Sequence, residues 1–111
     1  MTMTDEGAAH RAAHRAAHRA AHRGDLTAAR SEIERVDRAI VQLLGERLQV
    51  AAVVASTKRA AGLPVLDTEQ EARVIRRAAE WAREAELPDE EVRHLFWRIV
   101  AITRSAQAGW R

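Results

Sequence analysis

The chain has 111 residues, of which 47% are apolar, and 18 Lys and Arg against 16 Asp and Glu give a formal net charge of +2. This length fits one domain, and the small net charge lacks the basic excess that nucleic-acid-binding proteins show. The absence of cysteine excludes disulfides, thiolate catalysis and cysteine-ligated zinc. No uninterrupted apolar run approaches the ~18 residues of a membrane span, and the N-terminus has no apolar signal-peptide core. We therefore expect a cytoplasmic protein with neither nucleic acid nor a membrane as its partner.

Residues 1–24 form a low-complexity tail. Residues 8–23 are four copies of Ala-Ala-His-Arg, and a period of four would gather each residue type into a slowly drifting stripe on a helix. Alanine and arginine favour helix, but the repeat has no larger apolar side chain that could pack on a core. Histidines four residues apart can ligate a metal, although the simpler interpretation is an expanded repeat without a fixed partner. We expect residues 1–7 to be disordered and the repeat to be disordered or weakly helical.

The domain expected over residues 25–111 opens with one long helix over residues 26–61, for which Asp25 is a plausible N-cap. At about 36 residues and roughly 54 Å, it is far longer than the average helix of about 11–12 residues. Gly45 lies within it at a cost near 1 kcal/mol relative to alanine, which packing would have to offset. The apolar residues that recur at helical spacing are Leu26, Ile33, Val36, Ile40, Leu43, Leu44, Val50, Val53 and Val54.

Two shorter helices follow in the prediction. A glycine and a proline at 61–64 form a stop signal, and two overlapping capping boxes within residues 67–71 open a second helix that runs to about Glu86. Acidic residues at 89–91 open a third helix, which ends near residues 107–109. No segment alternates as a strand does. The predicted fold class is therefore all-α, with three helices, one of them very long.

The long helix cannot bury its whole apolar stripe within one chain. The other two helices have only about 19 residues each, and a core of about 87 residues is a size at which burial is marginal. Two long helices side by side, each covered by the short helices of the other chain, would solve both problems. We therefore predict an intertwined helical homodimer.

Three cations, Arg30, Arg47 and Lys58, lie among the apolar positions of the long helix. Arg47 and Lys58 are about three full turns apart, so they share a face. Arg30 precedes Arg47 by about 25 Å along the axis and lies on a different face. If the three cations serve one small ligand, Arg30 must come from a second copy of the chain.

Further polar residues occur in pairs spaced by one helical turn. Asp67 and Glu71 share one face of the second helix, and Thr103 and Gln107 share one face of the third. Capping alone would explain the first pair, and a frayed helix end would explain Gln107. Each of these residues taken singly therefore has a structural explanation, and only the whole set indicates a functional site. This set is Arg30, Arg47, Lys58, Asp67, Glu71, Thr103 and Gln107.

The order and spacing of this set resemble the AroQ-class chorismate mutases, including the 4-amino-4-deoxychorismate mutases. The resemblance covers about residues 26–108 and is specific because the polar positions keep their register through two loops. The family fold is an intertwined helical dimer, in agreement with the dimer predicted above. The matching motifs are Arg30-x-x-Ile33-x-x-x-Asp37, Leu43-Leu44-x-x-Arg47, Lys58, Pro64-Val65-x-Asp67-x-x-x-Glu71, Leu95-Phe96-x-x-Ile99 and Thr103-x-x-x-Gln107.

The resemblance implies a Claisen-type rearrangement of chorismate to prephenate, an isomerase reaction of aromatic amino acid biosynthesis. It is unimolecular, so it implies no cofactor, no metal and no covalent intermediate. Catalysis then depends on holding the compact conformer and stabilising the charge that separates in the transition state. The implied catalytic residues are Lys58 and Gln107, which would donate hydrogen bonds to the ether oxygen.

The resemblance also implies the residues that bind the substrate. Arg47 and the partner's Arg30 would bind the two carboxylates, because arginine pairs with a carboxylate in bidentate fashion, and Thr103 would assist one of them. Glu71 would accept a hydrogen bond from the hydroxyl at ring position four, and Asp67 would lie nearby.

Two positions depart from the family pattern. Gln70 stands where the family often has arginine, and Thr103 stands where serine is common. The missing cation weakens the expected binding of a dianion, which suggests 4-amino-4-deoxychorismate as a substrate. Its rearrangement would give 4-amino-4-deoxyprephenate, used for aminated aromatic natural products such as antibiotics. Its ammonium lowers the net negative charge and would suit Glu71. Both substrates stay open at this point.

Two other functions compete with the rearrangement. An isochorismate pyruvate-lyase would share the fold, but its substrate has no hydroxyl at position four and such relatives lack the pair of acids that Asp67 and Glu71 provide. A non-catalytic helical dimer module would not need the polar set, so the complete set argues against it.

Overall fold

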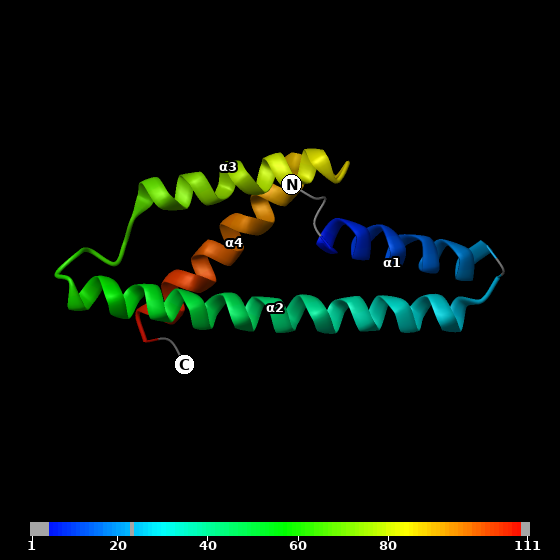
Figure 1. The fold of residues 1–111 in the computed structure, drawn as a ribbon, viewed down its shortest axis with the longest axis horizontal. Helices are drawn as coiled ribbons and strands as arrows, with labels where there is room; N and C mark the ends of the chain where they lie inside the picture. Colours follow the sequence, from blue (N-terminus) through cyan, green and yellow to red (C-terminus); the bar gives the residue numbers. More distant parts are fainter. Residues whose placement is uncertain (1–4, 23, 110–111) are drawn as a thin grey trace. The chain divides into compact units, whose positions relative to one another are not determined.

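The computed structural model is helical over the residues that it describes, 5–22 and 24–109, without strands in those ranges (Figure 1). The helices are α1 (Asp5–His22), α2 (Leu26–Ala60), α3 (Thr68–Glu84) and α4 (Asp89–Gln107). The chain divides into two compact units, Met1–Leu43 and Leu44–Arg111. The all-α class is confirmed, and the predicted number of three helices is wrong because the repeat also forms a helix.

The first unit contains α1 and the N-terminal half of α2. Helix α1 begins at Asp5, within the segment 1–7 for which disorder is predicted, and residues 1–4 of that segment lie outside the described residues. Helix propensity explains the difference, since alanine and arginine favour helix even where nothing larger than alanine can dock. The predicted N-cap of α2 is confirmed: Oδ1 of Asp25 accepts a hydrogen bond from the N–H of Ala28 at 2.9 Å.

Helix α2 is continuous, as predicted, but its own chain leaves it almost uncovered. Of its 35 residues, only Ala55 is buried. The large apolar side chains Val41, Leu43 and Val53 are 68%, 63% and 65% exposed. No atom outside the helix backbone lies within 4 Å of a Cβ built on Gly45, so nothing in the described chain packs there to offset its cost.

The length and composition of α2 are sufficient for a membrane span, a property that a search for uninterrupted apolar runs does not reveal. Two charged residues, Glu46 and Arg47, lie near the middle of this helix. A charged side chain at the centre of a bilayer costs about 2.5–3.5 kcal/mol, so a protein surface is the more favourable cover for α2.

The core of the second unit lies between α3 and α4, which pack against each other (Figure 1). Val74 and Ile75 of α3 form a buried cluster with Val100 of α4, and Phe96 packs against this cluster. The buried residues of α3 are Val74, Ile75, Ala78, Ala79 and Ala82. Their spacing of one helical turn or less places them on a single apolar stripe. The rest of the surface of α3 is left to polar residues.

The connection between α2 and α3 is defined by caps at both ends. Gly62, at a φ of 72°, follows the end of α2, and the N–H of Leu63 donates to the carbonyl of Lys58 at 2.8 Å, which is the Schellman arrangement. Asp67 caps α3 by accepting from the N–H of Gln70 at 3.0 Å, as one predicted capping box requires. The carboxylate of Glu71, expected to complete a second box, is instead paired with α4.

Helix α3 ends in the same arrangement without a glycine. The N–H of Leu87 donates to the carbonyl of Ala82 at 2.8 Å, and the N–H of Glu86 donates to the carbonyl of Arg83 at 3.1 Å. Glu86 therefore has a φ of 59°, in the left-handed region that favours glycine.

We predict that Glu86→Gly raises the free energy of unfolding by about 0.5–1 kcal/mol, because it removes the strain of a left-handed side-chain-bearing residue. The urea midpoint, followed by circular dichroism, measures this change. Glu80→Gly is the matched control in the middle of the same helix, where glycine should destabilise by about 1 kcal/mol. Equal destabilisation by both substitutions would contradict the assignment.

Candidate active site

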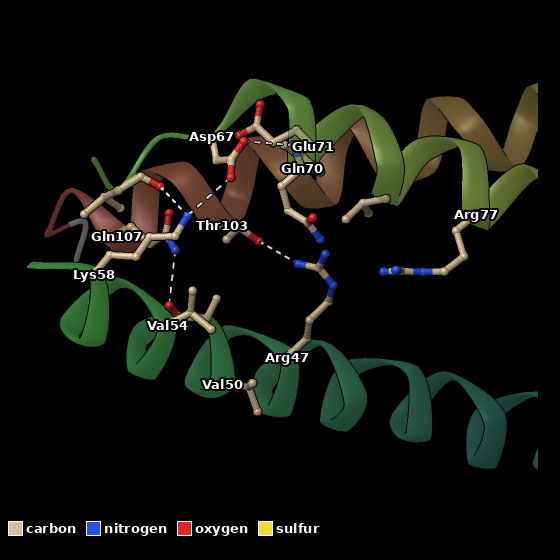
Figure 2. A pocket seen from close by; sticks show the side chains of 14 residues that line it. Arg47, Val50, Val54, Lys58, Asp67, Gln70, Glu71, Arg77, Thr103 and Gln107 are labelled. Atoms are coloured by element: carbon tan, nitrogen blue, oxygen red, sulfur yellow. Dashed lines mark hydrogen bonds and ion pairs between the residues drawn. The ribbon is translucent and has the colours of Figure 1, made fainter. Parts of the chain in front are cut away.

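A cavity of about 320 Å³ lies in the second unit among α2, α3 and α4 (Figure 2). Its volume is within the ~300–1,000 Å³ typical of small-molecule sites. The lining residues are Arg47, Val50, Ala51, Val54, Lys58, Val65, Asp67, Gln70, Glu71, Val74, Arg77, Val100, Thr103 and Gln107. Six of the seven predicted site residues are thus brought together. Arg30 belongs to the first unit and is not among the lining residues.

Helix α4 is tied to α2 by hydrogen bonds from residues that line the cavity. Nη1 of Arg47 donates to Oγ1 of Thr103 at 3.0 Å, and this hydroxyl donates to the carbonyl of Ile99 at 2.9 Å. One turn further along both helices, Nε2 of Gln107 donates to the carbonyl of Ala51 at 3.2 Å. The guanidinium of Arg47 and the amide of Gln107 are therefore both held at the wall of the cavity, each with further N–H groups to offer.

Lys58 lies at the end of the cavity nearest the α2–α3 connection (Figure 2). Its Nζ donates to the carbonyl of Val65 at 3.4 Å and lies 3.9 Å from Oδ2 of Asp67. Both contacts are long, and the side chain of Lys58 is only 23% exposed. An ammonium has three N–H donors, so Lys58 can direct a hydrogen bond into the cavity while Asp67 holds its position.

Glu71 is paired with Arg104 across α3 and α4. Nε of Arg104 donates to Oε2 of Glu71 at 2.8 Å, and Nη2 donates to Oε1, so the pair is bidentate. The hydrogen bond with Arg104 lowers the pKa of Glu71, and the positive charge of Arg104 adds to this, whereas burial and the charge of Asp67 raise it. The net shift is downward, so Glu71 is an anion at neutral pH.

Arg77 is a charged residue of the cavity that lies outside the predicted set. Figure 2 shows its guanidinium directed from α3 towards that of Arg47. Burial lowers the pKa of Arg47, and the nearby positive charge of Arg77 lowers it further, although an arginine stays charged in proteins. Arg77 lies two turns after Gln70 and three residues after Val74, so its helical register relative to those two positions is the signal that could have revealed it.

The charges around the cavity suit an anionic molecule with apolar parts. Three cations, Arg47, Lys58 and Arg77, line it together with two carboxylates, Asp67 and Glu71, and the remaining wall is largely valine. Arginine binds carboxylates well, and apolar walls strengthen such pairing by excluding water. Among the described side chains, which include most of the repeat histidines, no group of three or more His, Cys, Asp or Glu could hold a metal ion.

Residues 29–108 match the family model of chorismate mutase type II. The chain belongs to the chorismate mutase type II family. It is 32% identical over 76 residues to the T-protein of Enterobacter agglomerans, an alignment that covers 68% of this chain and 20% of that protein. It is 39% identical over 64 residues to a 3-dehydroquinate dehydratase of Pyrobaculum aerophilum, covering 58% of this chain and 21% of that protein. The chain thus spans about a fifth of the length of these curated relatives, and no solved structure matches it significantly.

We predict that the pair of Glu71 and Arg104 makes stability depend on pH in the acid range. A carboxylate whose pKa is lowered by folding stabilises the native state above its ordinary value of 4.5, and this contribution is lost as the pH falls through the lowered pKa. Glu71→Gln should therefore reduce the urea midpoint at pH 7, and its difference from wild type should shrink as the pH falls below about 4.5.

The control for this titration is a double-mutant cycle with Arg104→Gln. In that background, Glu71→Gln should have a smaller effect at pH 7, because the partner that lowers the pKa is gone. An effect of Glu71→Gln that is independent of pH in both backgrounds would contradict the pairing.

Proposed function

We propose that this protein converts chorismate to prephenate. The observation that supports this best is the convergence of Arg47 and Lys58 from α2, Glu71 from α3, and Thr103 and Gln107 from α4 on one cavity. In the rearrangement, the ether C–O bond breaks as a C–C bond forms within the same molecule, so no group enters or leaves. The protein then has to hold the reactive conformer and stabilise the developing charge, which preorganised donors can do.

The cations of the cavity are proposed to bind the two carboxylates of the substrate. Arg47 binds one of them together with the hydroxyl of Thr103, which would turn its proton from the carbonyl of Ile99 to the carboxylate. The partner's Arg30 binds the other, and Arg77 adds positive charge close to Arg47. Desolvation by the valine wall makes each of these charge pairs stronger than it would be in water.

Lys58 and Gln107 are proposed to stabilise the ether oxygen as negative charge grows on it. Both lie on the cavity wall, and each has N–H donors that its present contacts do not use. Gln107 is uncharged, so it donates without first having to gain a proton. Both donors are held by other groups before substrate arrives, which limits the reorganisation needed at the moment of reaction.

The charges of the cavity favour chorismate over its 4-amino analogue. Gln70 is uncharged, and the cation missing at this position is the reason to consider the amino compound. Oε1 of Gln70 accepts a hydrogen bond from Nε of Arg73 at 2.9 Å. Arg77, two turns further along α3, supplies a cation to the same cavity. The carboxylate of Glu71, which would attract an ammonium, already has Arg104 as its partner. The amino compound remains the second candidate, on the single observation of Gln70.

The homodimer is part of this proposal, because the described residues of one chain neither cover α2 nor bring Arg30 to the cavity. The exposed apolar side chains of α2 are far more extensive than a stable monomer needs to show. A second copy of the chain would bury them and would bring the partner's Arg30 to the cavity. Two active sites per dimer follow from the twofold symmetry expected of such a pair.

We predict that Lys58→Ala lowers kcat by about 10²–10³ while circular dichroism stays helical, which is the usual effect of removing one donor aimed at developing oxyanion charge. The loss of chorismate absorbance in the ultraviolet measures the rate. Arg98→Ala is the control, because Arg98 is an exposed cation of α4 outside the cavity. Near-normal turnover by Lys58→Ala would remove Lys58 from the chemistry.

We predict that a refolded mixture of Arg30→Ala and Arg47→Ala chains recovers activity that neither variant has alone. In a random mixture about half of the dimers are mixed, and one of their two sites has both arginines, so about a quarter of wild-type activity is expected.

The control mixture combines Arg47→Ala with Lys58→Ala chains, whose mixed dimers have no intact site because both residues serve the same cavity. Recovery in the control mixture, or none in the first although mixed dimers are present, would refute the shared site.

A further inference from the structure

We propose that Arg104 determines which substituent the site accepts at ring position four of the substrate. From outside the cavity it holds the carboxylate of Glu71, so that the site accepts a neutral hydroxyl and discriminates against an ammonium. This inference rests on the proposed function, in which Glu71 receives that ring substituent. Arg104 itself does not line the cavity and is therefore a specificity-determining and positioning residue rather than a catalytic one.

The geometry of the pair fixes the carboxylate without occupying it. Arg104 uses one lone-pair site on each oxygen of Glu71 through Nε and Nη2. A carboxylate has about four such sites, so two remain for a hydroxyl donor from the cavity side. The side chain of Glu71 is 16% exposed and that of Arg104 is 49% exposed, and of the two only Glu71 lines the cavity. A substrate hydroxyl can therefore bind without displacing Arg104.

An ammonium in the same place would meet a different balance of charge. Its attraction to Glu71 would be opposed by the guanidinium of Arg104 directly behind that carboxylate, and by the cations that share the cavity. Asp67, the other carboxylate of the lining, lies 3.9 Å from Nζ of Lys58. Local charge thus favours a substrate that stays a dianion.

The position of Arg104 on α4 explains how one helix both lines the cavity and pairs with Glu71. Thr103 and Gln107 lie one turn apart and face the cavity, whereas Arg104 is one residue, or about 100°, further round the helix. From there its long side chain reaches the outer side of Glu71 on α3. Lysine could not replace it in full, because only the planar guanidinium pairs with both carboxylate oxygens at once.

The test compares kcat/KM for chorismate and for 4-amino-4-deoxychorismate in wild type and in Arg104→Gln. Wild type should prefer chorismate, and the variant should shift the ratio by about tenfold or more towards the amino compound, because the charge opposing an ammonium is removed. Arg98→Gln, which removes the same charge from an exposed position of the same helix, should leave the ratio unchanged. Arg104→Lys keeps a positive charge beside Glu71 and should retain most of the preference.

The possible outcomes separate this inference from the proposed function. Turnover of neither compound by wild type would overturn the proposed function itself. Turnover of both with an unchanged ratio in Arg104→Gln, or with parallel losses for both compounds, would overturn the role of Arg104 and leave the reaction standing. Should Arg104→Gln fail to fold, the wild-type ratio decides, since a preference for the amino compound contradicts the inference.

Discussion

The cavity depends on two hydrogen bonds that tie α4 to α2 in matched register. Arg47 donates to Thr103, and one turn later on both helices Gln107 donates to the backbone of Ala51. A third bond, from Nη2 of Arg59 to the carbonyl of Gln107 at 2.9 Å, strengthens the same end. These bonds join the part of α4 that carries Thr103 and Gln107 to the part of α2 that carries Arg47. These three side chains are also among those proposed to act on the substrate. The fold therefore positions the donors before any ligand arrives, which is the condition for electrostatic catalysis.

Helix α2 links the cavity to the proposed dimer. Its C-terminal half supplies Arg47 and Lys58 to the cavity, and its exposed apolar side chains require a cover that the described chain does not provide. Both needs are met if a second chain packs on it and contributes its own Arg30. The choice between a substrate with a hydroxyl and one with an ammonium then depends on which charged side chains of the site already have ion-pair partners. Arg104 pairs with Glu71, whereas the guanidinium of Arg77 is directed towards that of Arg47 (Figure 2).

Much of the fold could be predicted from the sequence because its signals are local. The caps at Asp25 and Asp67, the glycine at 62 and the apolar period set the helix bounds to within one or two residues. The polar spacing identified six lining residues of the cavity. Arg77 shares its helical register with Gln70 and Val74 but lies outside the predicted set. Arg104 could not be found from spacing, because its role depends on a long side chain that reaches from α4 to Glu71 of α3. The repeat has no larger apolar residue that would dock it, yet it is helical in the structure because alanine-rich segments can be helical by propensity alone.

The proposed reaction is a rearrangement in which the substrate keeps all its atoms. Proton nuclear magnetic resonance of a chorismate solution incubated with the protein tests this directly, because it identifies the product as well as the rate. We expect the chorismate signals to give way to those of prephenate alone, at a rate proportional to protein concentration. Release of pyruvate, or chorismate that decays no faster than in a protein-free sample, would contradict it.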